Sequence, residues 1–163
     1  MKNIFSFFIA SFSVLYMNGQ VISTSNQPSQ IYPGGGVETG AHVYGVFADR
    51  TPCQEFLKEL NLDENPDCVK RKMYFKFYQD SATGKPTIYE TKAIGKWSGK
   101  GKWFILKGTP ADPNATVFQL ELDATTSLFL LKGDENVLFI LDKNENFLVG
   151  NEKFSYTLNR ARN

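Results

Sequence analysis

The chain has 163 residues and an aromatic content of 14%, which is enough apolar material for one domain with a hydrophobic core. Its 18 Lys and Arg nearly balance its 17 Asp and Glu, so it lacks the basic excess typical of proteins that bind nucleic acid or acidic membranes. We therefore expect a single domain and no nucleic-acid partner.

The first 20 residues have the pattern of a secretory signal peptide. Lys2 supplies a positive charge, and an apolar run broken only by serines follows at 4–17. This order predicts export, with cleavage after Gln20, and the alternative interpretation is an N-terminal strand or core helix. No later run approaches ~18 apolar residues, so we expect no transmembrane segment.

Residues 21–41 are dominated by Ser, Gln, Pro and Gly. Such a composition buries too little apolar surface to offset the entropy lost on ordering, so the segment is predicted to be a flexible leader. The alternative is a tail that uses Ile31 and Tyr32 to bind a partner. Residues 42–163 then form the domain.

From residue 42 onward, apolar residues recur at every second position, as in a strand with one wet face. Turn-prone clusters separate the runs, 98–101 among them, and the intervals are too short for helical crossovers. Strands are expected at 42–48, 72–80, 87–97, 102–107, 116–122, 127–131, 137–142, 147–151 and 153–158.

These short runs predict an all-β fold, a small antiparallel up-and-down β-barrel of lipocalin-like type with about eight strands. A closed barrel also removes the exposed edges that so many hairpins would leave. Met73 is expected in the core. Large residues are expected to point inward and fill the interior, namely Phe75, Phe77, Phe118 and Phe129.

One short helix is expected at residues 52–60. Thr51 can cap it, Pro52 suits the first helical position, and Gln54 completes a capping-box pattern with Thr51. We expect the helix to lie across one end of the barrel as a plug. Its apolar face carries Phe56, Leu57 and Leu60.

Both cysteines of the chain flank this helix. In an exported protein, Cys53 and Cys68 are expected to form a disulfide that ties the helix to the sheet. One alternative is a reactive thiol, because Cys53 lies near a helix N-terminus. A metal site is the other alternative, but two cysteines and the distant His42 supply few ligands.

The order of several segments resembles the N-terminal domain of the NlpE family of envelope copper-resistance lipoproteins. The segments are VYGVFADRTPCQEF at 43–56, GKW at 95–97, VLFILDKNENFL at 137–148 and VGNEKFSYTLNR at 149–160. The resemblance implies a lipocalin-like barrel, a role in copper tolerance, adhesion or envelope stress signalling, an envelope protein partner, and copper as the metal.

Two departures from the family pattern limit what carries over. The family's Cys-x-x-Cys is here Cys53-Gln54-Glu55-Phe56, so Cys53 is the only candidate metal ligand and no metal site is assigned. No lipidation cysteine follows residues 1–20, so lipid anchoring is not expected. The expected location is the periplasm or the cell surface of a Gram-negative bacterium.

Two further clusters are candidate sites. Lysines 96, 100 and 102, near Trp97 and Trp103, suit an anion or a sugar, although a solvated hairpin is the simpler interpretation. The acidic segments 134–136 and 142–145 lack EF-hand spacing and predict Asx-type turns.

No catalytic motif stands out. Ser127 and Ser155 fall in strand patterns without a Gly-x-Ser-x-Gly elbow, and His42 is the only histidine. The sequence therefore predicts an exported, non-enzymatic, NlpE-like envelope protein that acts in envelope or copper stress homeostasis or signalling through protein contacts. The alternatives are a lipocalin-like carrier of a small apolar ligand and an adhesive structural module.

Overall fold

The computed structural model describes residues 41–62, 65–94 and 97–161. The expected signal peptide at 1–20 and nearly all of the expected leader at 21–41 lie outside the described residues, and so does Lys96. Ala41, the last leader residue, already belongs to the first strand. No helix in the described ranges has the length and hydropathy needed to cross a bilayer.

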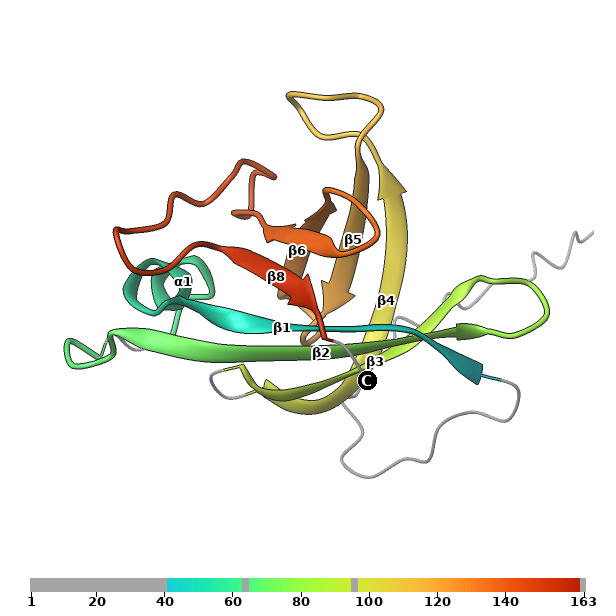
Figure 1. The fold of residues 1–163 in the computed structure, drawn as a ribbon, viewed down its shortest axis with the longest axis horizontal. Helices are drawn as coiled ribbons and strands as arrows, with labels where there is room; N and C mark the ends of the chain where they lie inside the picture. The colour runs from blue at the N-terminus through green and yellow to red at the C-terminus, as the bar shows by residue number, and fades with distance from the viewer. Residues whose placement is uncertain (1–40, 63–64, 95–96, 162–163) are drawn as a thin grey trace, which may run out of the picture.

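The fold is a closed, antiparallel up-and-down barrel of eight strands with one short helix (Figure 1). Each strand pairs with the next in the chain, and the last returns to the first, which confirms the predicted fold class. The elements are β1 (Ala41–Pro52), α1 (Gln54–Glu59), β2 (Lys70–Asp80), β3 (Pro86–Ile94), β4 (Trp97–Lys107), β5 (Thr116–Glu121), β6 (Ser127–Lys132), β7 (Val137–Ile140) and β8 (Thr157–Arg160).

The closure between β1 and β8 is short and is reinforced by one side chain. Phe47 pairs with Arg160, and Ala48 pairs with Asn159. The Arg160 guanidinium lies 4.7 Å from the ring centroid of Phe47 and donates to the Tyr44 carbonyl at 3.0 Å. A cation on an aromatic face and a bond to the backbone together join the two ends of the sheet.

Aromatic side chains fill the barrel interior. Met73, Phe75 and Phe77 are buried in alternation along β2, as the period of two predicts. Phe118 is also buried, and its ring centroid lies 5.0 Å from that of Trp103. Trp103 donates from Nε1 to the Tyr78 carbonyl at 2.7 Å, so its one polar group is satisfied inside the core.

The prediction for Phe129 is wrong. Phe129 is only partly buried, whereas its neighbours Leu128 and Leu130 are buried. The segment SLFLLK is apolar at every position from 128 to 131, so composition alone does not fix which face points inward. Pairing of β6 with β5 and β7 selects the leucine face.

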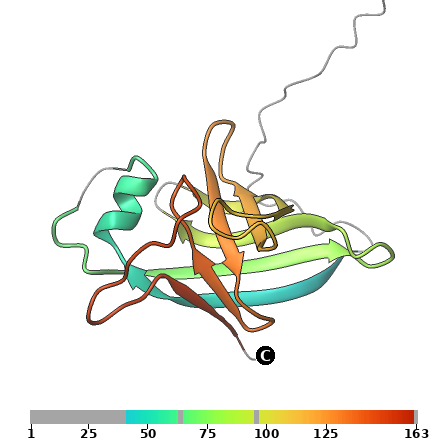
Figure 2. The ribbon, with the colours of Figure 1, turned by 90° about the horizontal axis from the view of Figure 1, so that it is seen from above.

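α1 covers one barrel end, where β1 ends and β2 begins, as Figures 1 and 2 both show. Its predicted apolar face is confirmed, because Phe56, Leu57 and Leu60 are buried. The predicted start of the helix is wrong. Thr51 and Pro52 are the last residues of β1, and Cys53 occupies the N-cap without a side-chain cap bond.

Strand boundaries also differ from prediction at three places. Residues 98–101, expected as a turn, lie within β4. Segment 147–151, expected as a strand, contributes only an isolated bridge between Leu141 and Phe147. The last strand begins at Thr157, later than the expected 153.

Candidate functional site: a lysine- and tyrosine-lined groove

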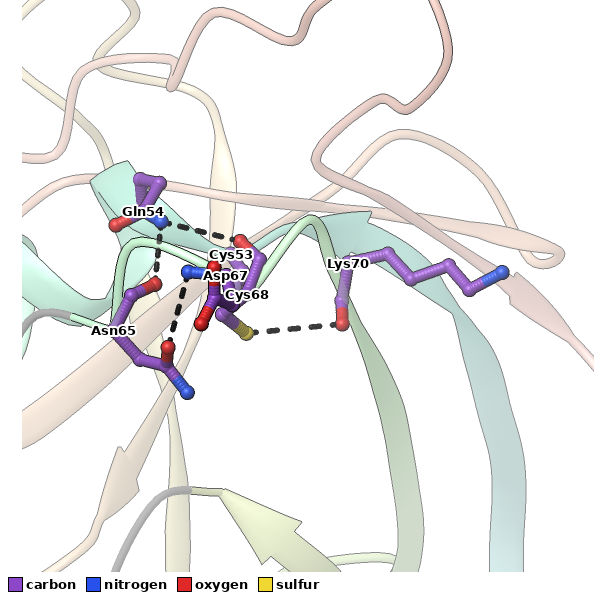
Figure 3. The surroundings of a disulfide bond; sticks show 6 residues. All are labelled: Cys53, Gln54, Asn65, Asp67, Cys68 and Lys70. Carbon is purple, nitrogen blue, oxygen red and sulfur yellow. Dashed lines mark hydrogen bonds between the residues drawn. A yellow bond between two sulfur atoms is a disulfide. The ribbon is translucent and has the colours of Figure 1, made fainter.

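The two cysteines form a disulfide, as predicted, with their Cα atoms 5.7 Å apart (Figure 3). Cys53 is 1% exposed and is the residue just before α1. The bond ties the start of the helix to the segment that leads into β2.

The Gln54 side chain adds hydrogen bonds across the loop that the disulfide closes. Its side-chain amide donates to the carbonyls of Asn65 and Cys68, at 2.5 and 3.3 Å (Figure 3). The predicted capping box would have turned this amide back toward Thr51, whereas it spans the disulfide loop instead. A pocket of about 310 Å³ beside the disulfide is lined by both cysteines, by Gln54 and, from the last part of the chain, by Asn151.

The residues at hand do not fit a resident copper ion. Both sulfurs are committed to the disulfide, so Cys53 offers no thiolate. Across the described ranges, no group of three or more His, Cys, Asp or Glu side chains comes together. The ring of His42 instead lies 2.6 Å from the side-chain amide of Gln79.

The expected lysine cluster around the tryptophans is divided by the barrel wall. Trp97 and Trp103 are buried, at 4% and 1% exposure. Lys100 and Lys102 pair with Glu90 and Ile88 across β3 and β4, and the Lys100 ammonium lies 2.9 Å from the Glu90 carboxylate. Lysines and tryptophans therefore do not form one site.

The acidic segments make turns, as predicted. Asp142 Oδ1 accepts hydrogen bonds from the backbone amides of Asn144 and Asn146, each at 2.8 Å. Asp134 Oδ1 accepts from the amide of Asn136 at 2.6 Å. These carboxylates cap their own loops.

Two pockets that share Tyr74 and Lys92 lie along β1 to β4. One part, about 530 Å³, is lined by Ala48, Asp49, Arg50, Lys72, Met73, Tyr74 and Lys92. The second part, about 300 Å³, is lined by Tyr74, Lys76, Glu90, Thr91, Lys92, Gly99 and Lys100. Because both parts share Tyr74 and Lys92, we treat them as one feature, the outer groove.

The outer groove is basic although the chain as a whole is nearly neutral. Five cationic side chains line it, against the carboxylates of Asp49 and Glu90. Two ammonium groups lie over tyrosine rings: Lys92 lies 5.1 Å from the Tyr74 centroid, and Lys76 lies 5.0 Å from that of Tyr78. Of these two rings, that of Tyr74 lines the groove.

Glu90 interacts with several residues of the second part of the outer groove. Burial alone would raise the pKa of this carboxyl, but hydrogen bonds from Lys100 and Tyr78 and the charges of Lys100 and Lys76 lower it below the ordinary value. The pKa of Lys76 is raised, chiefly by its hydrogen bond with Tyr78. Both groups therefore stay charged at neutral pH.

Sequence reasoning identified the polar face of β2 but missed the groove. The alternation of Lys72, Tyr74 and Lys76 was the available signal. The contributions of Arg50 and Lys92 depend on the registers of β1 and β3, which no local pattern supplies. Comparison with models of protein families, with curated protein sequences and with solved structures found no match to this chain.

Proposed function

We propose that the protein is an exported, NlpE-like envelope protein that acts by contact with another protein, without catalysis, in copper or envelope stress homeostasis or signalling. The observation that carries the proposal is the contrast between a filled interior and a grooved exterior. Phe77 is fully buried, and its ring centroid lies 5.0 Å from that of Trp103 inside the barrel. The charged groove lies on the outside.

This contrast favours surface binding over transport of an apolar ligand. A lipocalin-like carrier needs a hollow of a few hundred Å³ inside the barrel. Here the rings of Phe47, Phe75, Phe77 and Trp103 occupy the interior and contact one another. The barrel architecture itself agrees with the one that the NlpE resemblance implies.

Export is tested by expressing the full chain in a Gram-negative host and measuring the intact mass of the protein released from the periplasm. The proposal expects a product that lacks residues 1–20. A full-length product retained in the cytoplasm would contradict it.

The role in stress is tested in the bacterium that encodes the protein. A deletion strain should grow worse than its parent under copper or detergent stress, and the wild-type gene should restore growth. Lys72→Glu combined with Lys92→Glu should fail to restore it, because the reversed charges lie in the outer groove. Lys153→Glu, an exposed lysine outside the groove, is the matched control. A deletion without any phenotype would reject the proposal.

Copper binding is tested separately by calorimetry with Cu(I). With the Cys53–Cys68 bond intact, we expect no heat of binding, because neither sulfur is a thiolate. Heat from the oxidised protein would instead indicate a metal site at other residues. In that case copper itself, not a partner protein, would be the ligand to pursue.

A further inference from the structure

We propose that the outer groove binds an extended acidic segment of a partner protein, which adds to the sheet as a strand along β2. This inference rests on the proposed function and names the chemistry of the partner. Strand addition requires three things: a free backbone edge, room beside it, and side chains that select the added strand.

The free edge is the beginning of β2. β2 pairs with β1 along its whole length, down to Pro52 and Lys70. Among the described residues, β2 pairs with β3 only between Phe75 and Gln79. Residues 70–74 therefore have a strand neighbour on one side only. Figure 1 shows β1 and β2 continuing together toward α1 beyond the region where β2 pairs with β3.

Thr91 belongs to the last residue pair between β2 and β3 toward the start of β2. Thr91 Oγ1 donates to the Tyr74 carbonyl at 2.8 Å. The Tyr74 carbonyl therefore points away from β1. Alternate residues of a strand present both backbone groups to the same side, so the N–H and C=O of Lys72 point the same way. No strand of the described chain pairs with Lys72 on that side.

The room and the charge lie at the same place. The larger part of the outer groove, about 530 Å³, runs along residues 72–74 of β2. Arg50, Lys72 and Lys92 are exposed there, and no ion pair joins any of them to another described residue. In an added strand, the residue opposite Lys72 would share its outward face. A segment with Glu or Asp at every second position therefore fits.

Other occupants fit less well. The chain's own residues 21–41 contain a single acidic residue, Glu38, so they lack the complementary charge. A second copy paired through the same edge would place Lys72 near Lys72, and like charges repel. An acidic polysaccharide matches the charge but has no peptide backbone to pair with β2.

The test uses fluorescein-labelled decapeptides that alternate Glu and Thr, with binding measured by anisotropy on protein whose disulfide is intact. N-methylation of the Glu amides removes donors that face β2 and should weaken binding about tenfold or more. N-methylation of the Thr amides alters only the outer edge and should leave affinity unchanged. A Gln–Thr peptide should also lose about tenfold or more in affinity, because it lacks the carboxylates.

Protein variants give a second, independent test. Lys72→Glu combined with Lys92→Glu should weaken the Glu–Thr peptide about tenfold or more. Lys102→Glu reverses an exposed charge on the outer face of β4, outside the groove, and should not. Circular dichroism checks that each variant folds. If a variant does not fold, the methylated peptides still test the inference on the wild-type protein.

Three results would overturn the inference: no binding up to about 1 mM peptide, equal affinity for both methylated peptides, or equal affinity for polygalacturonate. The last two would assign the groove to charge alone. Failure here differs from failure of the proposed function, which is judged by the deletion phenotype. A stress phenotype without peptide binding would reject strand addition only.

Discussion

At the scale of single residues, two threonines show how much a buried hydroxyl depends on its partner. Thr51 is fully buried, and its Oγ1 has no hydrogen-bond partner among the described residues. Thr91 is buried too, but its Oγ1 donates to the Tyr74 carbonyl. An unpaired buried polar atom costs stability, whereas a paired one contributes to it.

We therefore expect opposite effects from the same substitution. Thr51→Val keeps the branched shape, removes the unpaired hydroxyl, and should leave the free energy of unfolding unchanged or raise it by about 1 kcal/mol. Thr91→Val removes this hydrogen bond to the Tyr74 carbonyl and should lower that free energy by about 1–2 kcal/mol. Urea unfolding followed by circular dichroism measures both. Equal losses for the two variants would contradict the assignment.

Asp123 links a single side chain to the pH dependence of folding. Burial alone would raise its pKa, but hydrogen bonds from the Thr125 and Thr126 amides, the Thr125 hydroxyl and Trp97 Nε1 lower it to about 2. Because the pKa in the folded state is below the unfolded one, this carboxylate stabilises the fold above about pH 4. That contribution is lost as pH falls from about 4 to 2.

The measurement is a carbon-detected NMR titration of the Asp123 carboxyl together with unfolding at several pH values. Asp123→Asn should lower stability at pH 7 and flatten the loss of stability between about pH 4 and 2. A carboxyl that titrates near its ordinary pKa would contradict this, because the bond from Trp97 would then not stabilise its charge.

At the scale of elements, the disulfide holds α1 against the barrel end. The sequence separation of the cysteines is 15, and closing a loop of that size stabilises by about 3 kcal/mol in the chain-entropy model. Cys53→Ser combined with Cys68→Ser should lower the free energy of unfolding by about that amount. Hydrogen exchange should also speed up at residues 54–62, since α1 loses its covalent tie.

The control is addition of a reducing agent, which should reproduce the loss in the wild type and change nothing in the double variant. Unaltered exchange over 54–62 in the double variant would show that burial of Phe56 and Leu60 alone holds the helix. The contribution of the bond would then lie in the unfolded chain.

The errors in predicting elements share one physical cause, which is pairing between distant residues. Thr51 and Pro52 suit a helix start locally, but pairing of β1 with β2 as far as Pro52 keeps them extended. The sequence predicts that Gly101 belongs to a turn, yet it lies in β4. A Cβ there would come within 2.7 Å of the Tyr89 ring, so this glycine permits a close approach.

At the scale of the whole molecule, the barrel was predictable and the groove was not. Alternation along each strand and short connections specify an up-and-down sheet, and closure follows from the need to remove edges. The groove arises where β2 separates from β3 after the Phe75–Thr91 pair. Since that separation depends on the registers of three strands, no single segment encodes it.

If aromatic side chains fill the barrel, the protein should not bind a small apolar ligand in its interior, whereas a carrier should. The wild type should not bind a small aromatic probe such as benzene, because four rings surround Phe77 at centroid distances of 5.0 to 6.0 Å. Phe77→Ala should lower the free energy of unfolding by about 3–5 kcal/mol and leave a dry void that takes up the probe.

The readout is the melting temperature with and without benzene. Benzene should raise it for Phe77→Ala, since a ligand that binds only the folded state stabilises it. The matched control is Phe129→Ala, which removes the same side chain from a partly exposed position on the outside and should show no rise. A rise for the wild type would mean that the interior admits a ligand, and transport would then replace surface contact as the function to test.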